Sequence, residues 1–573
     1  MKCRFCGRDT RNRNRICEYC EPFICEICGE ALSRGYCAIC GKLVCDNDSR
    51  LVGFARVCTK CLQRNPKLGD YDYLKKTVLM EAKRFISPPR TDFIKILELG
   101  DLPKGKEVYV HIGLDDFDSP YGLCTTYAAA RIAYMVRKSF DVRFLDFPLL
   151  VRLNPNIPLK TRGNAGTAIR IRVHIEDLNN LIESVPKLVS KLSHGFFRKT
   201  QPALAMYMTE RYVVDQVLNR AYFKSVRSVY PPKVLLQELR SMRTGYLIVY
   251  SSKQSIPRGI VGAVAAIGAT FDDYTFELLA YRQRKNIGKE RDINIKSVFQ
   301  MNKELFPLTF GNVDGNRILI APKGPDPVLF GIRGETPEIV YKAFQMIEHE
   351  DIELWAIFRT NQATSTHIRS IKNVEEAHPY ETVMIECQVI SADRKNDKVF
   401  LKASVVGGYV EGIAYRLQRT LQSNILKLRP NDKIKLVIAI TEKTGNTIRG
   451  NIEEFVPITL EPETITKNSR CPRCCARLKK KSKNIMYCKK CGLRIQGVFK
   501  ITIRIPRREL SIGKRYLPPP KAYRHLTMPN ERIYFRAKKL FGKVQTYLTE
   551  PLLSIEKEVT LIKTETIREP ETI

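Results

Sequence analysis

The sequence lacks the long apolar runs that membrane-spanning and secreted proteins carry. Its longest apolar stretch runs from Gly259 to Phe271, contains three glycines and is too short to cross a bilayer. The N-terminal residues Met1-Lys2-Cys3-Arg4 show no apolar signal core. We therefore expect a cytoplasmic protein that has no membrane partner.

A common nucleotide-binding motif is also missing, and histidine is scarce. No Gly-x-x-x-x-Gly-Lys-Ser/Thr sequence occurs, which excludes an ordinary P-loop enzyme, so any ATP site needs another loop to hold its metal. Histidine is scarce, and residues 1–110 contain none. Catalytic zinc sites commonly use histidine ligands. We therefore expect any zinc in that region to be structural.

Acidic residues are outnumbered. Lys and Arg total 96 against 60 Asp and Glu, which gives a net charge of +36 and points to a polyanionic partner, most simply a nucleic acid. A hydrophobic content of 44% is typical of globular chains. At 573 residues the chain is too long for one core, so several domains are expected.

Cysteine is concentrated near both ends of the chain, mostly in Cys-x-x-Cys pairs that indicate zinc. The first predicted site is Cys3, Cys6, Cys17 and Cys20. Four further pairs favour a cross-braced module in which Cys25, Cys28, Cys45 and Asp48 hold one ion and Cys37, Cys40, Cys58 and Cys61 the other. Sequential pairing of Cys25, Cys28, Cys37 and Cys40 is the alternative, and Asp48 is the weakest ligand.

The most informative stretch is an apolar segment, Val108–Leu114, that ends in an acidic cluster, Asp115-Asp116-Phe117-Asp118-Ser119. Gly122 and a pair of threonines then lead into an Ala-rich helical segment. Carboxylates suit magnesium, and a helix start suits phosphate. The alternative is a solvated turn in which Asp118 or Ser119 caps the helix.

A second loop, Arg152-Leu-Asn-Pro-Asn-Ile-Pro-Leu-Lys-Thr-Arg-Gly-Asn164, is shaped by proline and glycine. Lys160 and Arg162 on this loop are expected to bind phosphate oxygens. Phosphate contacts are therefore predicted from Ser119, Gly122, Arg152, Lys160 and Arg162.

These motifs resemble the archaeal agmatinylcytidine synthetases for isoleucine tRNA (the TiaS family), and the likeness spans roughly residues 107–528. The resemblance implies an ATP-dependent ligase that joins agmatine to carbon 2 of the wobble cytidine of the CAU-anticodon isoleucine tRNA, so that the tRNA decodes AUA. It also implies that Asp115, Asp116 and Asp118 bind magnesium and ATP and that Thr125 is the hydroxyl that becomes phosphorylated. The family's usual Thr is replaced here by Phe117, which removes a hydroxyl near the metal.

Agmatine is a dication, so its pocket needs carboxylates. Asp273 and Glu277 are the candidates, at the spacing of one helical turn, although either could be a surface charge or pair with Arg282. The small-residue segment Arg258–Ala269 between the two loops and these carboxylates favours a helix that packs closely on a sheet.

The expected fold is multidomain α+β, with zinc ribbons at both ends. Its parts are N-terminal zinc modules (1–65), a linker with a helix (66–105), a kinase-like α/β catalytic domain (106–225), a ferredoxin-like domain (226–370), an OB-fold barrel (378–460), a zinc ribbon (466–500) and a basic C-terminal region (501–573). The ribbon ligands are Cys471, Cys474, Cys488 and Cys491, and they flank a basic run that is suited to phosphate.

Two other functions fit parts of the sequence. A non-catalytic tRNA-binding paralogue would keep the barrel and the zinc modules while Phe117 disables the metal site, and a zinc-rich DNA-binding factor would leave the acidic loop unexplained. The Arg-rich loops at Arg11, Arg13 and Arg15 suggest that the N-terminal modules help to grip the tRNA. Oligomeric state does not follow from the sequence.

Overall fold

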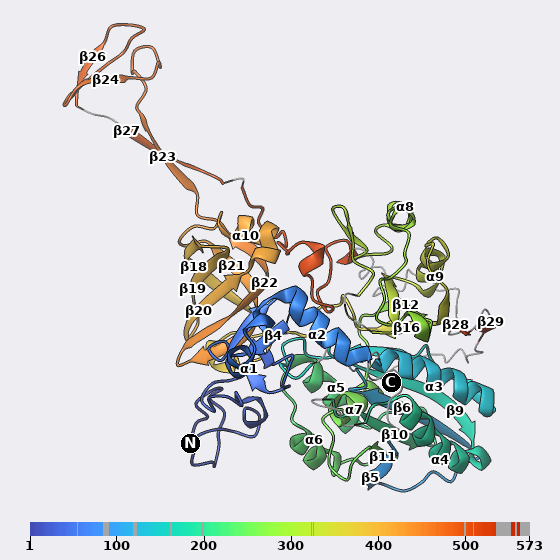
Figure 1. Ribbon diagram of the computed structural model, residues 1–573. Helices are drawn as coiled ribbons and strands as arrows, with labels where there is room; N and C mark the ends of the chain where they lie inside the picture. The colour runs from blue at the N-terminus through green and yellow to red at the C-terminus, as the bar shows by residue number, and fades with distance from the viewer. Residues whose placement is uncertain are drawn as a thin grey trace.

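The computed structural model describes residues 1–53, 55–83, 91–118, 123–160, 163–195, 200–322, 324, 326–497, 500–507, 509–533, 552–555 and 558–561. The chain forms a large α/β body, a barrel beside it, a cysteine-rich N-terminal region against both and a ribbon on a projecting arm (Figure 1). No helix in these ranges is long and apolar enough to span a membrane.

One mixed sheet runs through the body. Its main path is β15 (Val328–Gly334), β12 (Thr275–Arg282), β16 (Ile352–Thr360), β8 (Leu149–Arg152), β9 (Ala165–His174), β6 (Glu107–Asp115), β10 (Ala203–Thr209), β11 (Tyr246–Ser251) and β5 (Ile94–Leu99). Shorter strands extend it: β7 (Val142–Phe144) pairs with β9, and the hairpin of β28 (Leu552–Ile555) and β29 (Glu558–Leu561) pairs with β16. Parallel pairing of β8 with β16 joins the two halves of the body.

Helices cover both faces of this sheet. The helices α3 (Thr125–Ser139) and α4 (Ile175–Lys191) pack on one face, while α5 (Gln216–Arg227), α6 (Pro232–Leu239) and α7 (Ile260–Ile267) cover the other. The strands β12, β15 and β16 carry α8 (Ile295–Leu305) and α9 (Pro337–Gln345) over a separate core that contains Trp355. The alternation of strands and helices expected of an α/β domain is confirmed between residues 108 and 192: the apolar segment Val108–Leu114 lies in β6, the Ala-rich helical segment is α3, and β9 and α4 follow.

The segment predicted as a linker contributes more than one helix. Helix α1 (Thr59–Arg64) still belongs to the N-terminal modules. After its one long helix, α2 (Tyr71–Lys83), the linker supplies β5, which pairs with β11 at the edge of the large sheet. The sequence did not predict this strand, because Lys95 and Glu98 interrupt its apolar residues and most of its side chains are half-buried or exposed, as is usual at a sheet edge.

The predicted barrel is confirmed. The strands β18 (Thr382–Lys395), β19 (Lys398–Val405), β20 (Gly408–Ala414), β22 (Thr447–Thr459) and β21 (Lys433–Thr444) pair in that order, and β18 closes on β21. Helix α10 (Arg419–Ile425) lies between the third and fourth strands in sequence. The short strand β17 (Ile368–Ser370) extends β18 towards the body.

An arm of two strands leaves the barrel, β23 (Glu463–Asn468) paired with β27 (Lys500–Ile505). It carries a small sheet of β24 (Lys479–Ser482), β25 (Ile485–Tyr487) and β26 (Arg494–Gln496), which projects well away from the body (Figure 1).

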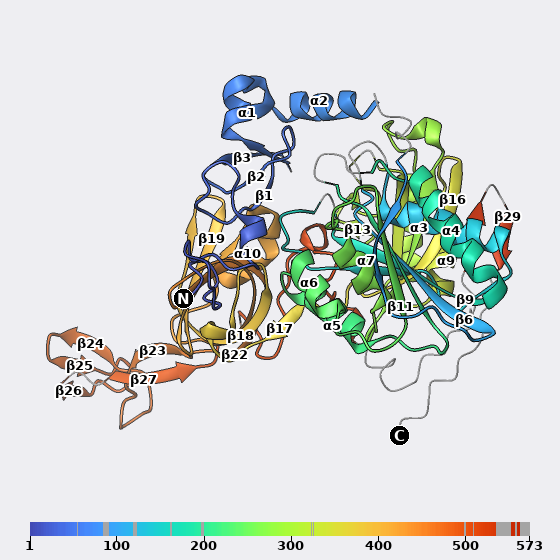
Figure 2. The ribbon, with the colours of Figure 1, turned by 90° about the horizontal axis from the view of Figure 1, so that it is seen from below.

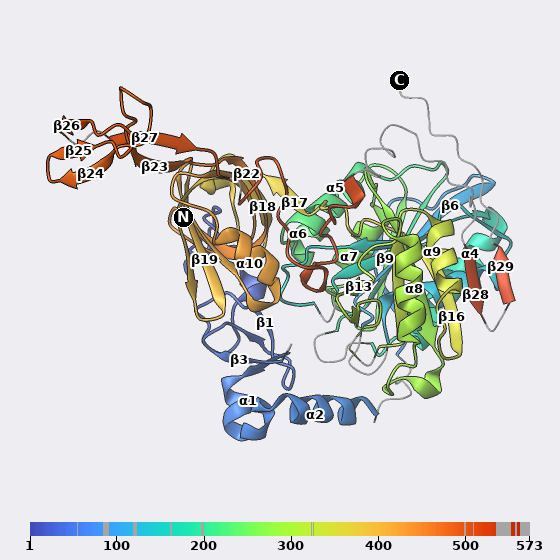
Figure 3. The ribbon, with the colours of Figure 1, turned by 90° about the horizontal axis from the view of Figure 1, so that it is seen from above.

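The N-terminal region contains short strands, β1 (Gly35–Tyr36), β2 (Leu43–Val44), β3 (Ser49–Val52) and β4 (Ala55–Cys58). It lies along the barrel, on the side of the barrel that also faces the body (Figures 2 and 3).

The chain returns from the arm to the body and is held there by a buried arginine. Arg532 is fully buried, and its guanidinium makes two hydrogen bonds of 3.1 and 3.0 Å to the carboxylate of Asp273. It also contacts Glu335, with an Nε–Oε1 distance of 2.5 Å, and the carbonyl of Ala363. Because this one cation bonds both carboxylates, the C-terminal segment fastens the β12 and β15 ends of the sheet.

We expect Arg532→Met to destabilise the body by about 3–5 kcal/mol, since it removes a fully buried cation that is hydrogen-bonded to two buried carboxylates. Urea unfolding followed by fluorescence of Trp355, the only tryptophan in the sequence, measures this directly. The matched control is Arg429→Met, because Arg429 pairs with Glu509 at 3.3 Å with both side chains over 40% exposed, and its loss should cost about 1 kcal/mol or less. Equal effects would show that the Arg532 cluster does not fasten the body.

Candidate catalytic site and metal centres

The acidic loop begins where the central strand β6 ends, at Asp115. Helix α7 lies directly against this end of the strand: a Cβ built on Gly262 would lie 1.9 Å from the Asp115 carboxylate, and one on Gly113 would lie 2.2 Å from the carbonyl of Ala263. Only glycine allows this approach. The prediction that the small-residue segment packs closely on a sheet is confirmed, and its glycines make room for the Asp115 side chain.

Asp116 adopts a left-handed backbone, with φ of 65°, and turns its carboxylate towards α7. Its Oδ2 accepts hydrogen bonds from the Arg258 guanidinium at 2.6 Å and from the backbone N–H of Gln201 at 2.9 Å. Arg258 precedes α7, so the same helix that packs on β6 also delivers the cation to this carboxylate.

Asp118 and Thr125 join the loop to the start of α3. The Asp118 carboxylate accepts a 3.0 Å hydrogen bond from the backbone N–H of Thr125, and the Thr125 hydroxyl accepts one from the N–H of Phe117 at 3.3 Å. Cys124 is the N-cap residue, its sulfur accepting from the N–H of Tyr127. The capping alternative therefore holds in part, because Asp118 binds the first N–H of the helix.

The Phe117 side chain points away from this loop. It is 2% exposed, and its ring stacks on Phe93 with centroids 6.1 Å apart in the core beneath α3. The contact with the Thr125 hydroxyl is made by the backbone N–H of residue 117, a group that every residue except proline has. In this structure, then, the substitution at position 117 changes the core under the loop and leaves the Thr125 contact in place.

The acidic pair carries more negative charge than its surroundings neutralise. Burial, reinforced by the charge of Asp116, raises the pKa of Asp115 well above its ordinary value. Burial also raises the pKa of Asp116, against the opposing effect of Arg258. Two adjacent buried carboxylates with one arginine form a donor set that suits a hard divalent cation such as magnesium. Asp118 and Asp116 are each turned towards a protein donor, so the three carboxylates do not converge on one point as the cysteine clusters do.

Two cavities meet at this loop. The larger, about 620 Å³, is lined by the three aspartates, Lys160 and Arg258, with apolar walls from Leu153, Ile157 and Leu159. The smaller, about 330 Å³, is lined by residues that include Cys124, Arg152, Glu277, Arg333 and His525. Asp118, Thr125, Gly163 and Ala165 line both, so the Thr125 hydroxyl lies at their junction.

The second predicted loop reaches both cavities. Burial, aided by Arg524, lowers the pKa of Lys160 to about 7 on the side of the larger cavity. Arg152 lies in the smaller one, where its guanidinium donates to Glu277 at 3.0 Å and to Gln362 at 2.9 Å. The other predicted phosphate ligands, Ser119, Gly122 and Arg162, lie outside the described residues.

The spacing argument for the agmatine carboxylates is wrong, because Glu277 lies in strand β12 and Asp273 in the turn before it. Glu277 is buried between Arg152 and Arg333 and faces the smaller cavity. Asp273 binds Arg532, and Arg282 pairs with Glu350 at 2.7 Å, so the suggested pairing of these carboxylates with Arg282 is also wrong. The two carboxylates are four residues apart, a spacing that fits one turn of a helix, and nothing in the run Asp-Tyr-Thr-Phe-Glu by itself identifies a strand.

Sequence reasoning missed several residues that line these cavities, namely Gln201, Arg258, Arg333 and His525. His525 belongs to the Pro-rich C-terminal motif, which returns to the body through a backbone hydrogen bond from the Ala363 N–H to the His525 carbonyl. The nearby charge of Arg152, with burial, holds the pKa of His525 well below its ordinary value. The four missed residues reach the cavities through contacts between segments that are distant in the sequence, and no local sequence pattern indicates such contacts.

Four sets of ligand atoms converge as the cysteine spacing predicts, each within 4.8 Å: Cys3, Cys6, Cys17 and Cys20; Cys25, Cys28, Cys45 and Asp48; Cys37, Cys40, Cys58 and Cys61; and Cys471, Cys474, Cys488 and Cys491. The structure thus brings together the cross-braced sets and not the sequential alternative. Asp48 Oδ2 lies 3.2 Å from the sulfur of Cys25 and 3.1 Å from that of Cys45. These clusters have the donors and spacing of tetrahedral zinc sites.

Comparison with known proteins yields matches over most of the chain. Residues 111–228 match the family description "TiaS TCKD domain", and residues 257–367 match "TiaS FLD domain". The isoleucine-tRNA 2-agmatinylcytidine synthetase TiaS of Pyrococcus horikoshii is 35% identical over 426 residues, which is 73% of this chain and 96% of that protein. The crystal structure of TiaS in complex with its isoleucine tRNA and ATP matches with a TM-score of 0.60 and 29% identity, and that of TiaS with the tRNA, AMPCPP and agmatine with 0.59 and 27%; each covers 74% of this chain and 98% of the other.

The four clusters predict four zinc ions per chain, and Asp48→Ala should lower that number towards three, because a carboxylate ligand of one cross-braced site is lost. Metal analysis of the purified full-length chain counts them. Asp46→Ala is the control, since Asp46 pairs with Arg34 and Arg56 outside the ligand sets. Four ions in the Asp48 variant would remove Asp48 from the ligands.

Proposed function

This chain belongs to the TiaS family of isoleucine-tRNA 2-agmatinylcytidine synthetases, and from that premise we propose that it is an ATP-dependent ligase that joins agmatine to carbon 2 of the wobble cytidine of the CAU-anticodon isoleucine tRNA. The identity extends over nearly the whole length of the relatives. The net charge of +36 suits a tRNA substrate.

The observation that supports this activity best is the position of Thr125 at the junction of two cavities. We propose that the larger cavity, with the acidic loop, receives the triphosphate, and that the smaller one receives agmatine. A hydroxyl at their junction is placed to accept the γ-phosphoryl group, as the resemblance implies for Thr125.

The chemistry requires activation of the cytosine, because an amine does not displace a carbonyl oxygen directly. Transfer of the phosphoryl group to the oxygen on carbon 2 turns that oxygen into a leaving group. The agmatine amine then forms the carbon–nitrogen bond, loses its protons and expels the oxygen as phosphate.

Positive groups around the acidic loop would stabilise the phosphates during this transfer. Arg258 and Lys160 line the larger cavity, and the N-terminus of α3 points into it at Thr125. Magnesium bound by Asp115 and Asp116 would neutralise charge on the phosphates. Because the pKa of Lys160 is about 7, binding of a polyphosphate would also favour its protonated form.

The smaller cavity supplies the groups expected for agmatine. Glu277 and Asp326 line it together with the apolar side chains of Leu279, Leu319 and Ile320, which suit a guanidinium on an aliphatic chain. We propose Glu277 as an agmatine contact, and we assign Asp273 to the Arg532 cluster.

We propose that the two halves of the body are a kinase-like domain (106–225) and a ferredoxin-like domain (226–370). The four cysteine clusters are proposed as structural zinc sites. The barrel and the ribbon, with its fully exposed basic strand β24, are proposed to bind the tRNA.

Incubation of the full chain with ATP, magnesium, labelled agmatine and the CAU-anticodon isoleucine tRNA tests the function. We expect label in the tRNA and a loss of about 10²-fold or more in Asp116→Asn, which keeps the shape and the left-handed backbone but removes the charge. Asp141→Asn, an exposed change in the same half of the body, should behave like the unchanged chain. Tight tRNA binding without incorporation would instead favour the non-catalytic paralogue.

We expect Phe117→Thr, which restores the family's usual residue, to leave incorporation unimproved and to destabilise the body by about 3 kcal/mol, because the Phe117 ring is buried on Phe93. Phe117→Leu should cost about 1.5 kcal/mol or less. Urea unfolding followed at Trp355 and the labelling assay measure the two effects. A clear gain in incorporation by the threonine variant would show that position 117 faces the reacting groups.

A further inference from the structure

The cross-braced zinc module, residues 21–61, lies outside the stretch of motifs by which the family is recognised, which begins at residue 107. The match with the Pyrococcus horikoshii protein covers 96% of that protein but only 73% of this chain, so this chain contains residues that the relative does not match. The relatives therefore give no role for the module. Its position in the structure nevertheless connects it to the catalytic site.

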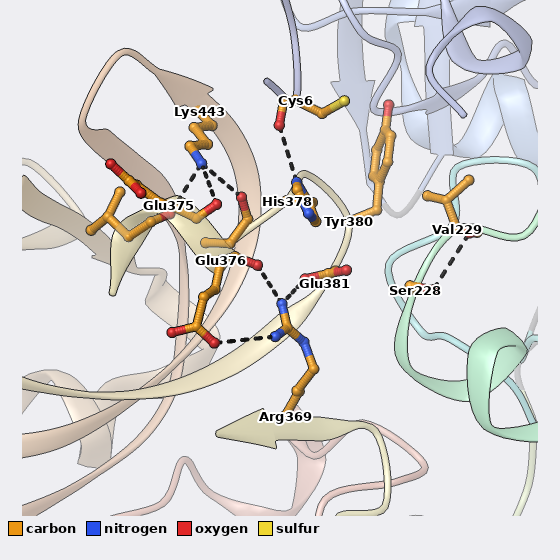
Figure 4. Close-up of polar contacts among 12 residues, drawn as sticks. Cys6, Ser228, Val229, Arg369, Glu375, Glu376, His378, Tyr380, Glu381 and Lys443 are labelled. Carbon is orange, nitrogen blue, oxygen red and sulfur yellow. Dashed lines mark hydrogen bonds and ion pairs between the residues drawn. The ribbon is translucent and has the colours of Figure 1, made fainter. Parts of the chain in front are cut away.

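The N-terminal region is docked on the barrel and the body through specific contacts. The His378 ring lies 3.0 Å from the Cys6 carbonyl (Figure 4). The Tyr380 hydroxyl donates to the Ser33 carbonyl at 2.8 Å. Tyr380 also packs on Phe23, with ring centroids 5.3 Å apart, beside Val229 of the body. Cys6 is one of the clustered ligands and Ser33 lies in the sequence between the ligands Cys28 and Cys37, so bound metal ions would help to hold both carbonyls in place.

The docked module forms part of the wall of the larger cavity. Residues 21–26 and Leu43 line it opposite the acidic loop. The module also borders a groove of about 950 Å³ that continues from the cavity, since Ile157 and Lys160 line both. The other wall of this groove is the barrel, at Lys398, Ile413 and Tyr415.

The chemistry of the groove fits a polyanion with flat rings. Five of its lining side chains are cationic, Arg34, Arg56, Lys160, Lys398 and Arg524, and one, Asp46, is anionic. On the barrel side Tyr415 is 41% exposed, with the Lys398 ammonium 5.5 Å from its ring centroid. Cations that follow a groove, with aromatic side chains on which bases stack, are the usual means of binding single-stranded nucleic acid.

We infer that the cross-braced module is a substrate-binding part of the enzyme: with the barrel it forms a groove that holds the single-stranded RNA next to the target cytidine and directs that base into the larger cavity. The identity of the RNA rests on the proposed function. An acidic peptide would also meet the cations, but the groove adjoins the larger cavity at Ile157 and Lys160, where a tRNA substrate has to arrive.

The wall is tied to the metal sites. Tyr36 directly precedes Cys37 and Arg34 lies three residues before it, while Asp46 follows Cys45. Arg56 lies two residues before Cys58 and forms a β-bridge with Cys37. The zinc clusters would therefore fix the spacing of the wall against the barrel, which accounts for a metal scaffold in a part too small to form a large core.

Leu51 offers a test, because it lies on this wall in β3 and is 61% exposed. Binding of an unmodified anticodon stem-loop with a CAU anticodon to the full-length chain is measured by fluorescence anisotropy at fixed salt. We expect Leu51→Glu to weaken binding about fivefold or more and Leu51→Lys to tighten it, because charge in the groove acts directly on RNA phosphates. Damage to the hairpin would not produce effects of opposite sign.

Gln63→Glu is the matched control, since Gln63 is an exposed residue of α1 in the adjoining segment, outside the groove, and should change binding less than twofold. Equal weakening by Leu51→Glu and Gln63→Glu, or no effect of either Leu51 change, would overturn the inference. Agmatine incorporation by the unchanged chain, measured alongside, separates the two hypotheses. If the unchanged chain incorporates agmatine but the Leu51 changes do not alter RNA binding, only the groove inference is refuted. If the Leu51 changes alter RNA binding but the unchanged chain incorporates no agmatine, only the proposed ligase activity is refuted.

Discussion

The structure depends most on the contact between helix α7 and the end of strand β6. Gly262 allows the Asp115 carboxylate to lie against the helix backbone, and Gly113 allows the helix to approach the strand. The same helix brings Arg258 to Asp116. A side chain at either glycine would force the helix away, because the nearest atoms are backbone or carboxylate rather than a flexible tip. The geometry of the acidic loop is therefore a consequence of helix packing on the far side of the sheet from α3.

Buried charge is the second theme, and it is balanced unevenly. Glu277 is matched by Arg152 and Arg333, and Arg532 is matched by Asp273 and Glu335. These groups hold segments that are distant in sequence, and breaking them leaves unpaired charge inside the protein. At Asp115 and Asp116 two adjacent buried carboxylates lie near one arginine, and burial raises the pKa of both carboxyls. A bound divalent cation would favour their charged forms, so a metal ion and this pair would stabilise each other where the proposed reaction needs the metal.

The features that depend on a local sequence pattern could be predicted from the sequence. Cysteine spacing led to the cross-braced clusters, hydrophobic periodicity to β6, α3 and the barrel strands, and small residues to the packing of α7. Sequence analysis failed where the deciding partner is remote. The edge strand β5 is defined by β11, some 150 residues away, and Glu277 was placed on a helix although β15 and β16 make its segment a strand. The orientation of Phe117 towards Phe93 could not be read from the motif, because adjacent residues of a loop can face opposite sides.

The positions of the metal clusters suggest a division of labour in RNA binding. The ribbon stands at the end of the β23–β27 arm, whose six-residue strands span about 20 Å, and it presents an exposed basic strand away from the body. The cross-braced module lies against the body and borders the cavity itself. A contact far from the reacting base contributes affinity without selecting that base, whereas a contact beside it fixes which nucleotide enters. On this argument the proposed roles differ: the ribbon would grip the tRNA, and the module, together with the barrel, would govern the entry of the wobble cytidine.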